Sequence, residues 1–163
     1  MTVILGIPIP SADPIFLSLV AVHIAFGLGA VIAGLGAMLS GKGRGAHSNF
    51  GITYFWCLFG VFVTMGLLSF FRWAEDYPLF ILGTLAFVAA YAGRSAIRSR
   101  TPRLHLTGMA ASYILMLTAF YVDNGKNLPL WDRLPQIAFW SLPSTIGLLL
   151  LAYYLFRLPK FKL

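Results

Sequence analysis

The sequence alternates long apolar stretches with short polar links along almost its whole length. A helix needs about 20 apolar residues to cross a hydrocarbon core of ~30 Å. The stretches run apolar without the strict alternation of an outer-membrane barrel strand, so a barrel is excluded. The pattern predicts an all-α integral membrane bundle, one domain over residues 1–163, with five transmembrane helices. The predicted spans are residues 15–40, 49–71, 78–96, 104–122 and 136–156.

The links add local expectations. Residues 72–78 form an interfacial cluster that ends at Pro78, where the third span starts, and residues 126–135 lie along the interface. Pro143 is expected to kink the fifth span or to shorten its regular part.

Composition agrees with a membrane protein. Of the 163 residues, 59% are hydrophobic and only 10% are charged, and the mean hydropathy is +0.82. The net charge of +7 is therefore read through membrane topology and not as a nucleic-acid surface. The one cysteine, Cys57, excludes a disulfide framework. The N-terminus lacks a basic region, so the first helix is expected to be retained.

The charges segregate between the two ends of the spans. All five acids fall on the opposite side from nine of the 12 lysines and arginines. By the positive-inside tendency, this places the N-terminus outside and the C-terminus in the cytoplasm. The prediction is a multi-pass protein of the bacterial inner membrane. The nine are Lys42, Arg44, Arg94, Arg98, Arg100, Arg103, Arg157, Lys160 and Lys162.

A weak internal repeat relates the two halves. In each half a helix rich in small residues and a basic link precede a histidine. The first copy reads His47, Gly51, Tyr54, and the second reads His105, Met109, Tyr113. If the repeat is real, His47 and His105 lie at the same membrane depth on parallel repeats. Chance similarity is the alternative.

His23 lies eight residues into the first predicted span, about 12 Å deep. Gly27, Ala30 and Gly34 share its helical face, which predicts a trough beside the imidazole. An intramembrane histidine needs a partner and is a functional candidate. The alternative is a histidine that simply hydrogen-bonds to a neighbouring helix.

His47 and His105 are candidate haem b ligands, because membrane cytochromes hold haem iron between histidines on two helices. Gly51 and Gly108 are expected to leave space for the macrocycle. Arginines could then pair with the propionates. The alternative is that these arginines set topology and bind anionic lipid headgroups, and that the histidines are interfacial. The arginines concerned are Arg44, Arg98, Arg100 and Arg103.

Other chemistry is poorly supported by the sequence. His23 is 17 residues from the inner end of its span, about 25 Å, so the three histidines cannot share one small metal ion. Met65 and Met116 are the thioethers available for a separate His/Met site, although a methionine in a membrane helix far more often serves packing. No acid lies inside a span, and no hydrolase or phosphate-loop motif occurs. Tyrosines and Trp56 could line a quinone pocket or could simply pack.

The combination of His23 with Gly27, His47 with Gly51 and Tyr54, and His105 with Met109 and Tyr113 resembles a bacterial family of small multi-span predicted membrane proteins of unknown function. The similarity covers residues 21–113. Family members often carry arginine after the second histidine, where this chain has Ser48 and Leu106. The resemblance implies no activity, but it implies that the three histidines form one pattern.

The leading hypothesis is a haem b protein that moves electrons within the membrane through His47 and His105, with His23 at a second or quinone-proximal position. A non-enzymatic accessory or assembly subunit, packed against a larger membrane partner or another copy of itself, is an alternative from another class. A small transporter or lipid-handling protein is a third.

Overall fold

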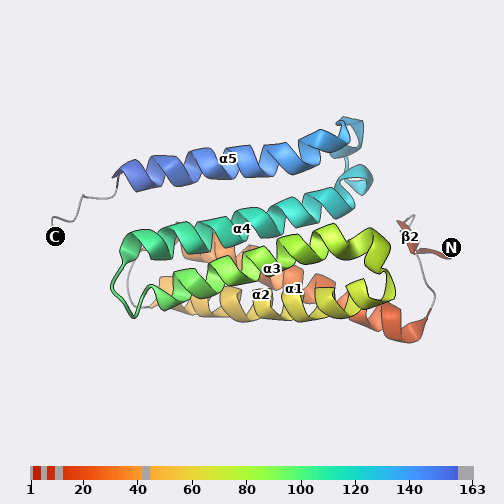
Figure 1. Cartoon of the computed structure of the whole chain (residues 1–163), viewed down its shortest axis with the longest axis horizontal. Helices are drawn as coiled ribbons and strands as arrows, with labels where there is room; N and C mark the ends of the chain where they lie inside the picture. Colours follow the sequence, from red (N-terminus) through yellow and green to blue (C-terminus); the bar gives the residue numbers. More distant parts are fainter. Residues whose placement is uncertain (1, 5–6, 10–12, 42–44, 158–163) are drawn as a thin grey trace. The chain divides into compact units, whose positions relative to one another are not determined.

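The computed structural model describes residues 2–4, 7–9, 13–41 and 45–157. Five long helices dominate this part of the chain (Figure 1). Each is long and apolar enough to cross a membrane, as the sequence predicts. Before them, strands β1 (Thr2–Ile4) and β2 (Ile7–Ile9) pair antiparallel, with Thr2 opposite Ile9. The protein is therefore a multi-pass helical membrane protein, and its orientation stays a prediction.

The chain forms two compact units, Met1–Phe80 and Ile81–Leu163, which divide within the third helix. The first unit contains α1 (Pro14–Leu39), α2 (Ala46–Phe71) and the start of α3 (Trp73–Ser95). The second contains the rest of α3 together with α4 (Pro102–Asn124) and α5 (Gln136–Arg157). Each unit is described by itself, and the single bundle over the whole chain stays a prediction.

In the first unit, α1 and α2 pack against each other as an antiparallel hairpin (Figure 1). Glycines on one helix receive larger side chains from the other. A Cβ atom on Gly60 would lie 2.6 Å from the ring of Phe26, and one on Gly36 would lie 2.8 Å from the ring of Phe50. Small residues thus let the two backbones approach closely, which is how helices associate in lipid without a hydrophobic driving force.

In the second unit, α3 and α4 make their closest approach at two facing glycines. A Cβ atom on Gly108 would lie 2.6 Å from the Cα of Gly93 and 2.7 Å from the carbonyl oxygen of Ala89. A Cβ atom on Gly93 would lie 2.8 Å from the backbone nitrogen of Met109. These neighbours are backbone atoms, so they cannot rotate away as a side chain could. Only glycine fits at either position without separating the helices.

The α4–α5 hairpin is closed by an aromatic cluster at one end. Trp131, in the short 3-10 helix η2 (Trp131–Arg133), stacks on Tyr121 of α4 with ring centroids 4.1 Å apart. It also contacts Phe139 of α5, which covers Gly125 in the 3-10 helix η1 (Gly125–Asn127). The link therefore packs as part of the fold, with a tryptophan at its centre.

Two prolines behave differently from the sequence prediction. The third helix starts at Trp73, five residues before Pro78, and the fifth continues through Pro143 as one assigned helix. The predicted start of the third span at Pro78 is thus five residues too late, and α5 is not shortened at Pro143, whereas the alternative that Pro143 kinks the helix stays a prediction. Glu75 and Asp76, in the first turn of α3, interact favourably with the positive end of the helix dipole and support the earlier start.

The glycine contact gives a test of the second unit. We expect Gly108→Ala to lower the free energy of unfolding by about 1–3 kcal/mol, because the added methyl group overlaps the α3 backbone. Gly83→Ala is the matched control, since a Cβ atom there meets nothing within 4 Å. Unfolding of the detergent-solubilised protein, followed by circular dichroism during SDS titration, measures both. Equal stability of the two variants would show that the close approach is wrong.

Candidate functional site

His47, the second residue of α2, connects the start of α2 to the end of α1, at the turn of the first hairpin. Its ring nitrogen Nδ1 lies 2.8 Å from the carbonyl oxygen of Ala37. Ala37 belongs to the last turn of α1, where backbone carbonyls run out of helical donors. Gly45, just before α2, has a φ of 107°, a left-handed conformation that suits glycine and turns the chain toward this contact. His47 thus caps the C-terminus of α1.

His105 makes the same connection in the second unit. Its Nδ1 lies 2.8 Å from the carbonyl oxygen of Gly93, in the last turn of α3. The amide of Ile97, which would bond to Gly93 in a regular α-helix, donates to Arg94 instead. The turn beyond α3 then closes with Arg100 in a left-handed conformation, φ 52°. This tightening leaves the Gly93 carbonyl for the imidazole.

Both contacts determine where the neutral imidazole carries its proton. A backbone carbonyl can only accept, so Nδ1 of each ring is the protonated nitrogen and donates. The lone pair of the neutral ring is then on Nε2. Both accepting residues, Ala37 and Gly93, lie two positions before the last residue of their helices. The two hairpins share this detail, which supports the internal repeat predicted from the sequence.

His23 has a side-chain partner instead, about a third of the way along α1 from its start. Its Nδ1 lies 2.8 Å from Oγ1 of Thr64 on α2. Thr64 Oγ1 also lies 2.7 Å from the carbonyl oxygen of Gly60, and two oxygens at that distance require a proton between them. The hydroxyl therefore donates to Gly60 and accepts from His23. Because the hydroxyl proton is already used, the ring proton that it accepts is on Nδ1.

All three histidines therefore use the same ring nitrogen, Nδ1, for their hydrogen bond within the protein.

The chain matches no known protein family, no curated protein and no solved structure. The family resemblance stays a prediction, and the chemistry is argued from the residues themselves. His23 and His47 belong to the first unit and His105 to the second.

The spaces predicted beside the histidines are only partly present. A Cβ atom on Gly51 would meet nothing within 4 Å, so the predicted opening one turn after His47 exists. Gly108 leaves no such space, because it packs against the backbone of α3. The trough expected beside His23 is open at Gly27 but closed at Ala30, which is fully buried.

The other residues that the sequence suggested as ligands or as partners of the propionates lie as follows. Arg98 and Arg103 are exposed at the turn between α3 and α4, and Arg44 lies outside the described residues. Met116 is buried in the second unit, and Met65 follows Thr64, the partner of His23, on α2. Among the described residues, no group of three or more His, Cys, Asp and Glu could hold a metal ion.

Thr64 and the two carbonyls were missed by sequence reasoning. Thr64 could have been found, because it is one of few polar residues in the apolar run of α2. Ala37 and Gly93 could not, because any residue type has a backbone carbonyl.

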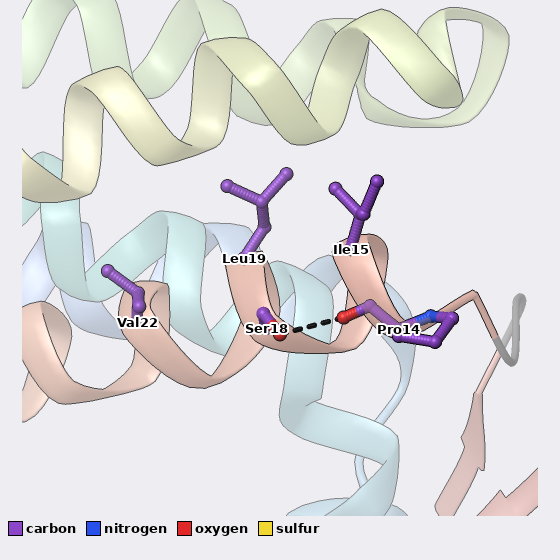
Figure 2. Close-up of a pocket in the computed structure, with 5 residues that line it drawn as sticks. All are labelled: Pro14, Ile15, Ser18, Leu19 and Val22. Atoms are coloured by element: carbon purple, nitrogen blue, oxygen red, sulfur yellow. Dashed lines mark hydrogen bonds between the residues drawn. The ribbon is translucent and has the colours of Figure 1, made fainter.

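The structure also shows a shallow groove on the first turns of α1, lined by Pro14, Ile15, Ser18, Leu19 and Val22 (Figure 2). Its hydroxyl, on Ser18, already donates to the Pro14 carbonyl, so the groove offers little chemistry.

Removing either hairpin contact should weaken its hairpin. We expect His47→Ala and His105→Ala each to cost about 1 kcal/mol of unfolding free energy, since each leaves a last-turn carbonyl without its imidazole donor. SDS titration measures the loss, and His47→Asn, which keeps an N–H donor on a shorter side chain, is the comparison. Unchanged stability in both alanine variants would contradict the capping role.

Proposed function

We propose that this protein binds haem b and carries electrons within the membrane, with His47 and His105 as the iron ligands. The observation that supports it is the matched pair of imidazoles. Each donates from Nδ1 to a last-turn carbonyl at 2.8 Å, at an equivalent place in its hairpin. Histidines that ligate metals usually donate their other ring N–H to such a carbonyl, which orients the ring and leaves Nε2 for the metal.

The surroundings fit the group on the His47 side. The opening at Gly51 lies one turn from His47 and could admit the edge of a macrocycle. On the other ligand's helix, Arg103 lies two residues before His105, and it and Arg98 are exposed cations suited to propionates. Because Gly108 is packed, room beside His105 would have to come from another face of α4. Bound haem would supply a one-electron redox centre; the chain would hold and orient it.

Absorption spectroscopy tests the proposal directly. Protein expressed with adequate haem supply and purified in mild detergent should show a Soret band, and an α band after dithionite reduction. His47→Ala and His105→Ala should each lose or shift these bands, because each removes one axial ligand. His23→Ala is the matched control and should retain them. A wild-type protein without either band would remove the proposal, leaving His47 and His105 as helix caps.

We further propose that the turn between α3 and α4 binds anionic lipid headgroups on the cytoplasmic side. Arg98, Arg100 and Arg103 are exposed there, and none forms an ion pair with a described carboxylate. The acid Asp123 lies in the last turn of α4, about 30 Å away along the helix axis. Charge is thus separated along α4, as expected where one end meets anionic phospholipid.

Lipid selectivity tests this second proposal. Replacing the three arginines by glutamine should lower the preference for phosphatidylglycerol over phosphatidylcholine by about 1 kcal/mol per arginine. The paired control replaces Lys126 and Arg133, at the opposite end of α4, and should leave the preference unchanged. Electron paramagnetic resonance of spin-labelled lipids in reconstituted bilayers measures it. An equal loss in both variants would show that the turn has no special role.

A further inference from the structure

His23 differs from the other two histidines in what holds it. His47 and His105 satisfy helix ends, whereas the backbone around His23 lies inside two long helices whose own hydrogen bonds are complete. His23 is therefore not needed to close the hairpin. It lies nine residues after the start of α1, about 14 Å along the axis, where a polar side chain is costly.

The second ring nitrogen of His23, Nε2, has no hydrogen-bond partner among the described residues. Thr64 engages Nδ1 of the ring at 2.8 Å. The structure shows no hydrogen bond from Nε2 of His23 to any described residue, so this nitrogen presents its lone pair to its surroundings. In a hydrocarbon environment an acceptor without a donor is unfavourable. A ligand that brings its own donor would remove that penalty.

The surroundings leave room for such a ligand on one side. Gly27 follows His23 by one helical turn on the same face, and a Cβ atom there would meet nothing within 4 Å. Phe26, one residue before Gly27, packs over Gly60 of α2. The open space at Gly27 is therefore where a ligand has room one turn from His23.

We propose that His23 is the binding site for a membrane-dissolved quinol, whose hydroxyl donates to Nε2 while its flat ring lies over Gly27. Three properties select this class. The ligand must dissolve at this depth, must carry a hydroxyl donor without a charge, and must be thin enough to lie against a glycine. Phospholipid headgroups fail the first condition, because they stay at the interface. The inference rests on the proposed electron-transfer function, for which a quinol is an electron donor.

The central test compares two forms of one probe. Decylubiquinol carries the hydroxyl donor and decylubiquinone does not, so the wild-type protein in phosphatidylcholine nanodiscs should bind the quinol about tenfold more tightly. Retention by immobilised nanodiscs under anaerobic conditions, with empty nanodiscs as the blank, gives both affinities. Equal affinity for the two forms would overturn the proposal, whatever the variants show.

The variants separate binding from folding. His23→Leu should abolish the tenfold preference, and His23→Gln, which keeps an acceptor, should restore part of it. Gly27→Leu should weaken quinol binding about tenfold while leaving the thermal unfolding temperature unchanged, because its side chain enters open space. Gly83→Leu, at a glycine with equally open surroundings in α3, is the control and should bind normally. A quinol preference that survives both His23→Leu and Gly27→Leu would also overturn the proposal.

The outcome is independent of the haem measurement. Quinol preference can be measured on protein expressed without added haem, and the haem bands can be measured on Gly27→Leu. Loss of the haem bands with an intact quinol preference removes the proposed electron carrier and keeps this site. Haem bands without a quinol preference would keep the proposed electron carrier and remove the quinol site at His23.

Discussion

In a hydrocarbon environment every backbone polar group must find its partner inside the protein, and the rest of this structure depends on that constraint. Backbone groups inside a helix hydrogen-bond to one another, so unpaired backbone groups arise only at helix ends. At two of those ends the chain uses a histidine from the following helix, His47 for Ala37 and His105 for Gly93. Polar side chains within the helices follow the same rule, since Ser112 and Thr118 bond to carbonyls one turn earlier. Among the described residues, buried Ser69 is the side chain whose oxygen lacks such a partner.

Close packing and carbonyl capping occur at the same place in each hairpin. Gly93 serves both, because its missing side chain admits the backbone of α4 and its carbonyl receives His105. In the first hairpin the two roles fall on neighbours, with Gly36 against Phe50 and Ala37 bonded to His47. Close approach brings the imidazole within reach of the carbonyl, and the hydrogen bond then holds the approach. Each hairpin is thus held near its turn by a close contact and a hydrogen bond as well as by the loop.

The helices were predictable because long apolar runs have few alternatives, and the predicted bounds agree within a few residues except at the start of α3. That the histidines need hydrogen-bond partners was also predictable, since a polar ring in such a run is costly without one. Their partners were not. Helical periodicity shows which residues share a face, but it does not show what covers that face, and so Gly108 was interpreted as space for a cofactor when α3 fills it. Thr64 was overlooked because threonine in a membrane helix commonly bonds only to its own backbone.

The contrast between the histidines separates a structural need from a functional one. A carbonyl at a helix end must be satisfied, so His47 and His105 would be useful even without any ligand. Thr64 has no such need, because its hydroxyl already donates to the Gly60 carbonyl. Replacing His23 by an apolar residue would leave no backbone group unpaired and would remove a polar ring from the membrane interior. A side chain whose removal would ease the fold is best explained by something that it binds, and that argument is stronger for His23 than for the pair that first suggested haem.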